Sequence, residues 1–132
     1  MREADQAECL ALGVTPEQAV RDGMACSLWT VAGVADGEVG CIFGLAAKGT
    51  LLNPVGVPWM LGTDLVATHR RVLARRAPAY IRRMLRTHPR LENVVHAKNT
   101  LAVRWLRRVG FTLRPPVPAP GGELFHPFEL RA

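Results

Sequence analysis

The sequence is poor in aromatic residues, has three cysteines and contains no long apolar run. Aromatic residues make up 6% of the 132 residues, so few side chains are available on which nucleic-acid bases could stack. No apolar run approaches the roughly 20 residues that a membrane-spanning helix needs, and neither a membrane anchor nor a signal peptide is expected. Cys9, Cys26 and Cys41 have no CxxC spacing, so we expect reduced, buried thiols and no metal site.

Acidic residues are scarce in the second half of the chain. Residues 1–69 hold three basic residues against eight acids, a net charge of −5. Residues 70–132 hold fourteen basic residues against three acids, a net charge of +11. This polarised pattern is typical of a protein that meets a charged partner, and a solvated basic helix face would give the same pattern.

Two helices are expected before the first strand. In the first, apolar residues recur at helical spacing and the pattern stops at Gly13. The second begins after Thr15, which can cap its start, and Pro16 suits its first position. It is expected to run to about Gly23.

A β-hairpin should follow the helices. Residues 28–31 and 39–43 are rich in β-branched and apolar side chains. Between them stands Asp36-Gly37, a pair that favours a tight hairpin turn.

The middle of the chain predicts a strand and a long basic helix. Residues 56–66 form the strand, and Pro58 and Gly62 within it predict a bulge or another irregularity. Residues 68–89 carry an apolar stripe, with arginines filling the rest of the helix surface. Pro78 should kink this helix or split it in two, because it lacks a backbone donor and crowds the preceding turn.

The C-terminal third predicts a strand at 91–97, a helix at 99–109 and two final strands in "FTLR" and "ELFHPFEL". Gly110 fits the position after a helix end, and the proline- and glycine-rich residues 115–122 should form a loop. The order of elements indicates a mixed α/β sheet with helices on its faces.

The segment "NTLAVRWLRRVGF" combines the late helix with the start of the next strand. It resembles the late segment N-x-x-A-x-x-Y-x-x-x-x-G-F of the GCN5-related N-acetyltransferase (GNAT) family, with Asn99, Ala102, Gly110 and Phe111 at the matching places. Trp105 stands where the family has tyrosine. The resemblance covers roughly residues 15–131. It implies one GNAT-like α/β (α+β) domain over 1–132, with a mixed, mostly antiparallel central sheet and helices on both faces.

The resemblance also implies where acetyl-coenzyme A would bind. In the family the cofactor lies in a split between two central strands, and its pyrophosphate sits on backbone N–H groups of a loop resembling R-x-x-G-x-G/A. Glycine suits such a loop because the phosphate must approach the backbone closely. The matching stretch, residues 65–76, has no glycine. If the cofactor site is retained, its residues are Leu65, Val66, His69, Arg70, Arg71 and Asn99.

Catalysis in the family uses a tyrosine as general acid and a carboxylate as general base. An indole N–H is far too weak an acid for the first role, so Trp105 is interpreted as a packing residue. Asp64 and His96 are the candidate bases. Each has a plainer interpretation, Asp64 as a helix cap or loop residue and His96 as a core residue. Whether the chain is an enzyme is left open by these residues.

Several phrases are similar to a narrower group, the small GNAT-like proteins encoded by tailed bacteriophages. They are the start of the chain, "GVPWMLGTD", the basic helix, "LENVVHAKN" and "VRWLRRVGF". The resemblance implies a catalytically degenerate fold in a podovirus-like particle, in several symmetric copies, at the tail or portal or inside the head. The protein would be made in the bacterial cytoplasm and reside in the virion. No cofactor is then expected, and its partners would be a portal, tail adaptor or fibre protein, with packaged DNA nearby.

Two other functions stay open. The chain could be an active acetyl-CoA-dependent N-acetyltransferase that modifies a host protein or a small amine. It could also be a basic nucleic-acid binder, which is the weakest of the three because its arginines follow one helix and aromatics are few. The predicted partner-docking residues on that helix are Arg71, Arg75, Arg82 and Arg86.

Overall fold

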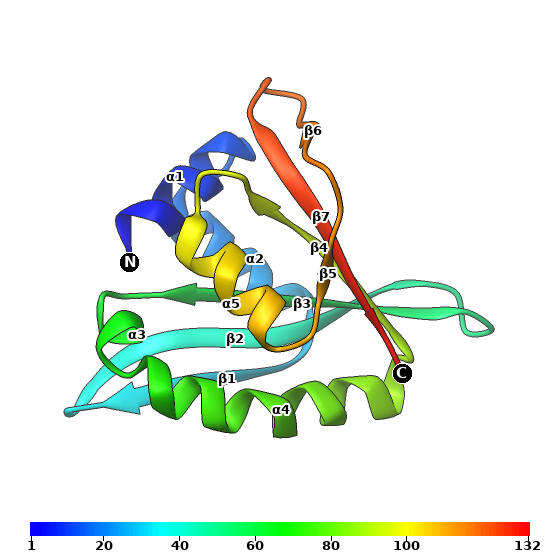
Figure 1. Cartoon of the computed structure of the whole chain (residues 1–132), viewed down its shortest axis with the longest axis horizontal. Coiled ribbons are helices and arrows are strands. Elements are labelled where there is room, and N and C mark those ends of the chain that lie inside the picture. The colour runs from blue at the N-terminus through cyan, green and yellow to red at the C-terminus, as the bar shows by residue number, and fades with distance from the viewer.

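The computed structural model describes all 132 residues, which form one sheet flanked by helices (Figure 1). The helices are α1 (Glu3–Ala11), α2 (Pro16–Cys26), α3 (Leu65–Thr68), α4 (Arg70–Thr87) and α5 (Thr100–Arg108). The strands are β1 (Ser27–Ala35), β2 (Glu38–Gly49), β3 (Pro54–Gly62), β4 (Arg90–His96), β5 (Thr112–Leu113), β6 (Val117–Pro118) and β7 (Leu124–Arg131). None of the helices combines the length and the apolar character needed to cross a membrane.

The sheet has the order β1-β2-β3-β4-β7-β5, and β6 pairs with β7. All neighbours are antiparallel except β3 and β4. Those two central strands pair in parallel at only two positions, Val55 with Arg90 and Gly56 with Leu91. Beyond Gly56 the strands separate and leave a split in the middle of the sheet. The mixed, mostly antiparallel sheet that the sequence predicts is therefore confirmed.

Helices cover both faces of this sheet, as predicted. Phe43 and Gly44 are neighbours on β2, so they face opposite sides. The Phe43 ring packs 4.8 Å from the ring of Tyr80 on α4. Gly44 faces Trp59, whose indole also lies against Gly23 of α2. Consequently α4 lies on one face of the sheet and α2 on the other.

The main core lies between the sheet and the pair α4 and α5. Its buried residues include Leu45 of β2, Met84 of α4, and Val103 and Leu106 of α5. Phe111, directly after α5, packs edge-on against Phe128 with ring centroids 5.1 Å apart. Because α4 and α5 share one core, they cover the same face of the sheet.

Local signals in the sequence account for several element ends. The Thr15 side chain accepts a hydrogen bond from the Gln18 N–H at 3.1 Å, which caps α2. Asp36 and Gly37 both have positive φ angles, 55° and 76°, as a two-residue type I′ hairpin turn requires. Gly110, with φ of 111°, ends α5.

The predicted irregularity of the third strand is wrong. The pairing of β2 with β3 runs without a register shift from Cys41 and Gly62 to Gly49 and Pro54. The Pro58 carbonyl points into the split, where it accepts a hydrogen bond from the Asn93 side chain. A backbone N–H at position 58 would also point into the split, so the proline removes no hydrogen bond between β3 and β2.

The long basic helix also differs from its prediction. It begins at Arg70, and the separate turn α3 precedes it where the strand was expected to end. The split expected at Pro78 is wrong, because α4 is continuous from Arg70 to Thr87. Pro78 is exposed, whereas Ala77 and Met84 on the inner side are buried and anchor both halves of the helix.

Candidate functional site

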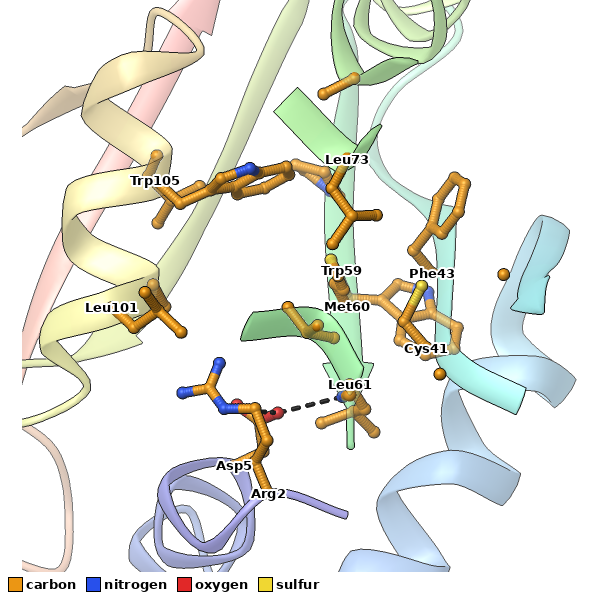
Figure 2. Close-up of a pocket in the computed structure, with 18 of the residues that line it drawn as sticks. Arg2, Asp5, Cys41, Phe43, Trp59, Met60, Leu61, Leu73, Leu101 and Trp105 are labelled. Carbon is orange, nitrogen blue, oxygen red and sulfur yellow. Dashed lines mark hydrogen bonds and ion pairs between the residues drawn. The ribbon is translucent and has the colours of Figure 1, made fainter. Parts of the chain in front are cut away.

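A cavity of about 580 Å³ opens where β3 and β4 separate. Its walls are mostly apolar and come from β2, β3, α4 and α5. Figure 2 shows Phe43 and Met60 on the strands, and Trp105 of α5 reaching toward Leu73 of α4. On the split itself, the Asn93 side chain donates a hydrogen bond of 2.8 Å to the Pro58 carbonyl and so joins the two strands.

Trp105 narrows the cavity between α5 and α4. Its indole Nε1 is buried and has no hydrogen-bond partner. A buried donor without an acceptor costs about 1–3 kcal/mol. The other tryptophan of the cavity, Trp59, is satisfied, since its Nε1 donates to Ser27 Oγ at 2.7 Å.

A polar cluster closes the end of the cavity beside α1. Arg2 donates to Asn99 Oδ1 at 2.9 Å, and Asn99 Nδ2 donates to Asp5 Oδ1 at 3.3 Å. The second oxygen of Asp5 accepts the Gly62 N–H at 3.0 Å, the bond drawn in Figure 2. Asp5 and Asn99 are buried. Both polar atoms of the Asn99 side chain, a predicted cofactor residue, therefore already have a partner within the chain.

Glu8 extends this cluster along α1. Its Oε1 accepts the His96 N–H at 2.5 Å. Burial raises the pKa of Glu8 above its usual value of 4.5, and the bond from His96 opposes this only in part. Glu8 is one of the two carboxyl groups in the cavity wall, the other being Asp5. Sequence reasoning missed it, because nothing near residue 8 indicates that α1 packs on β4.

The two predicted bases lie away from the cavity. Asp64 is exposed at the start of α3 and makes no capping hydrogen bond. His96 is buried, with its Nε2 3.2 Å from Glu123 Oε2 and its ring 5.1 Å from the Phe125 ring. Neither residue is part of the cavity wall. These positions agree with the plainer interpretation of both residues.

The segment expected to hold a phosphate is folded as the helical turn α3. Leu65, Val66, His69 and Arg70 line the cavity, whereas Arg71 does not. The Leu65 N–H donates to the side chain of Thr63, and the Val66 N–H to the Thr63 carbonyl. The next three N–H groups also donate to backbone carbonyls within residues 64–65. Every N–H from residue 65 to 69 is thus used inside the turn.

Gly62 stands directly before this turn. A Cβ atom at Gly62 would lie 2.5 Å from Cγ2 of Val66, so a side chain there would collide with α3. This glycine serves the packing of the turn against β3. The His69 ring, at the end of the turn, pairs with Asp36 of the β1–β2 hairpin at 3.2 Å.

Several solved acetyltransferases have the same arrangement. A GNAT-family acetyltransferase from Bacillus anthracis superimposes with a TM-score of 0.67 at 11% identity, over 98% of this chain and 82% of that one. The aminoglycoside acetyltransferase AAC(6')-Ib, in complex with coenzyme A, gives a TM-score of 0.64 at 15% identity, over 99% of this chain and 91% of that one. The chain has the GNAT acetyltransferase fold.

Other GNAT structures extend the comparison. One from Streptococcus pneumoniae has a TM-score of 0.61 at 13% identity. The superposition covers 78% of this chain and 66% of that one. The microcin C7 self-immunity acetyltransferase MccE, in complex with acetyl-CoA and AMP, has a TM-score of 0.66 at 13% identity, over 88% of this chain and 67% of that one. No family model matches the sequence. No curated protein matches it either.

The turn α3 decides how well the GNAT fold of this chain fits acetyl-CoA. A phosphate that binds to backbone donors needs N–H groups that point outward, and those of residues 65–69 point into the turn. The first N–H groups of α4, from Arg70 on, lie outside this turn, and the side chains of Arg70 and Arg76 reach the cavity wall. Residues 65–69 therefore supply no backbone donors to the cofactor's pyrophosphate, and only the start of α4 and these two arginines could hold it.

Proposed function

We propose that this protein is a structural component of a tailed bacteriophage particle that uses the acetyltransferase fold without transferring acetyl groups. The resemblance of several sequence phrases to phage-encoded GNAT-like proteins is the support for the particle role. Contacts with a portal, tail adaptor or fibre protein, residence in the virion and assembly in several copies belong to the same proposal.

The observation that carries the non-catalytic part is the bonding within α3. The N–H groups of residues 65–69 donate to Thr63, Asp64 and Leu65, so this stretch offers no backbone donors to the cofactor's pyrophosphate. Trp105 adds to this, since an indole N–H cannot protonate a leaving thiolate. Asp64 and His96 do not face the cavity.

The attachment surface in this proposal is the outer side of α4. Arg71, Arg75, Arg82 and Arg86 are exposed there, and none of them makes an ion pair within the chain. The double variant Arg71→Ala/Arg75→Ala should reduce the amount of protein that co-purifies with assembled particles. Arg21→Ala on α2 is the matched control, and equal co-purification of both variants would count against attachment through α4.

Calorimetry with acetyl-CoA tests the non-catalytic part. We expect no heat of binding to the wild-type protein at millimolar cofactor, because the N–H groups of residues 65–69 are bonded within the chain and residues 65–76 contain no glycine. Saturable binding with one cofactor per chain would overturn this part, and a screen of amine acceptors would then follow.

An active N-acetyltransferase is the second candidate, favoured by the cavity itself. The cavity lies at the split of the sheet, and its wall includes Glu8, whose raised pKa suits a general base. Under this alternative, Arg70 and Arg76 would hold the cofactor phosphates in place of backbone donors. Loss of acetyl-CoA binding in Arg70→Gln/Arg76→Gln, with wild-type binding intact, would establish this mode of cofactor binding.

A further inference from the structure

The outer surfaces of α4 and α5 form a face of one charge sign. Seven arginines lie on α4 and three on α5, and neither helix contains an acidic residue. All ten arginines are exposed. Since α4 and α5 cover the same face of the sheet over one core, these arginines belong to one layer of the molecule. The sequence alone places most of them along a single helix.

None of these arginines is neutralised within the chain. The arginines that form ion pairs within the chain are Arg2, Arg21, Arg90 and Arg114, which lie outside α4 and α5. Arg83 of α4 rests 4.3 Å from the centre of the Trp29 ring, a contact that keeps its charge. A solvated surface helix usually mixes both signs, so this face is unusual in its uniform charge.

Four of the arginines are aligned along α4. Arg71, Arg75, Arg82 and Arg86 are spaced by four, seven and four residues. With 3.6 residues per turn, they fall within roughly 60° of the helix circumference, and the 1.5 Å rise spreads them over about 22 Å. The buried Ala77 and Met84 lie on the opposite side of the helix. The result is a straight stripe of guanidinium groups that points to solvent.

We infer that this stripe binds the phosphate backbone of duplex nucleic acid. The inference rests on the proposed role in the particle, and it assigns the outer side of α4 to packaged nucleic acid in place of a virion protein. A phosphate backbone presents anions of one sign at regular spacing, and the planar guanidinium fork suits phosphate oxygens. An acidic protein surface normally mixes lysines and arginines among its carboxylates, and ten uncompensated arginines would repel those.

This surface should recognise neither individual bases nor single-stranded nucleic acid. The aromatic rings nearest to α4, Trp29 and Tyr80, pack against each other and Phe43 on the inner side, with centroids 6.4 Å apart for the first pair. They are not available for base stacking. Phosphate contacts fix position without reading sequence, so we expect binding of duplexes without sequence preference.

Fluorescence anisotropy with a labelled 20-base-pair duplex of arbitrary sequence tests the inference. If the four arginines each neutralise one phosphate, the logarithm of the binding constant should fall with the logarithm of salt concentration at a slope of about −3.6. The variant Arg71→Gln/Arg75→Gln/Arg82→Gln/Arg86→Gln removes these four charges, so its slope should be less negative by about 3.6. The control Arg21→Gln/Arg114→Gln removes two exposed arginines elsewhere and should leave the slope unchanged.

Three results would overturn the inference. These are no binding at low salt, equal loss in the control variant, or stronger binding to polyglutamate than to a duplex of equal charge. The last would assign the stripe to an acidic protein instead. Circular dichroism of each variant shows whether it is folded. The duplex-binding assay contains no coenzyme A. A negative result in it therefore does not affect the calorimetric test of the non-catalytic role.

Discussion

At the scale of single residues, the two cavity tryptophans differ in how their indole N–H groups are satisfied. Trp59 donates to Ser27, while the Nε1 atom of Trp105 is buried without an acceptor. Trp105→Phe removes a group that is costly to bury, so part of the lost packing is offset. Trp59→Phe loses packing and leaves Ser27 without its donor.

We therefore expect Trp59→Phe to lower the free energy of unfolding by about 1 kcal/mol or more beyond the effect of Trp105→Phe. Urea denaturation of both variants, followed by circular dichroism, measures the difference. An equal or larger loss in Trp105→Phe would show that the Trp105 N–H has an acceptor in solution.

Glu8 makes stability depend on pH. Its folded pKa is raised above 4.5 by burial, so the folded state holds the Glu8 proton more tightly than the unfolded state does. Stability from this group is full below the unfolded pKa and is lost as pH rises through the folded pKa. Ionised Glu8 therefore weakens the fold at neutral pH.

Glu8→Gln keeps an oxygen that can accept the His96 N–H and removes the charge. The variant should match the wild type near pH 4 and become more stable than it as pH rises toward 7. Urea midpoints measured across this range give the difference, and Ala4→Gly on the same helix should show no such pH trend. A constant difference at all pH values would contradict the burial of an ionised Glu8.

At the scale of elements, the tip of the β2–β3 hairpin displays two leucines to solvent. Leu51 and Leu52 are 101% and 99% exposed. The backbone groups of Thr50 and Asn53 bond to each other at 3.2 and 3.3 Å and close the tip. The apolar surface of the tip is thus held away from the core and remains available to a partner (Figure 1).

Leu51→Ser/Leu52→Ser should change the free energy of unfolding by less than about 0.5 kcal/mol, since neither side chain makes contacts that folding creates. Leu45→Ser, also on this hairpin but fully buried, should cost several times more, about 3 kcal/mol or above. Thermal and urea unfolding provide both values. A large loss at the tip would mean that the leucines pack against the body of the protein.

Local signals made much of the fold predictable from sequence. Thr15, Asp36-Gly37 and Gly110 set ends and turns through their own backbone geometry, and the structure confirms all of them. The turn α3 was missed because residues 65–68 are apolar and β-branched enough to extend the strand pattern. Its formation depends on Thr63 and Asp64 as acceptors, which periodicity does not reveal.

The candidate site was less predictable than the fold. Leu65, Val66 and Arg70 do reach the cavity, because they follow a central strand whose end opens onto the split. The partners of Asn99, Arg2 and Asp5, lie 97 and 94 positions away in the chain. No local pattern indicates contacts at such separations, so the polar end of the cavity could be found only in the structure.

At the scale of the whole molecule, the charge asymmetry of the sequence becomes an asymmetry in space. The acids of α1 and α2 belong to the N-terminal part, and α2 lies on the face opposite α4. The arginines of α4 and α5 cover the other face. A molecule with this distribution has a large dipole and approaches a polyanion with α4 and α5 leading.

The polar cluster of Arg2, Asp5 and Asn99 also has a kinetic consequence. It joins groups separated by 57 to 97 positions along the chain, and closing such long loops is costly in entropy before their contacts form. We therefore expect the docking of α1 onto β3 and α5 to form late, after the folding barrier. Weakening this cluster would speed unfolding and leave the folding rate nearly unchanged, so α1 sets how long each native molecule lasts rather than how fast it is made.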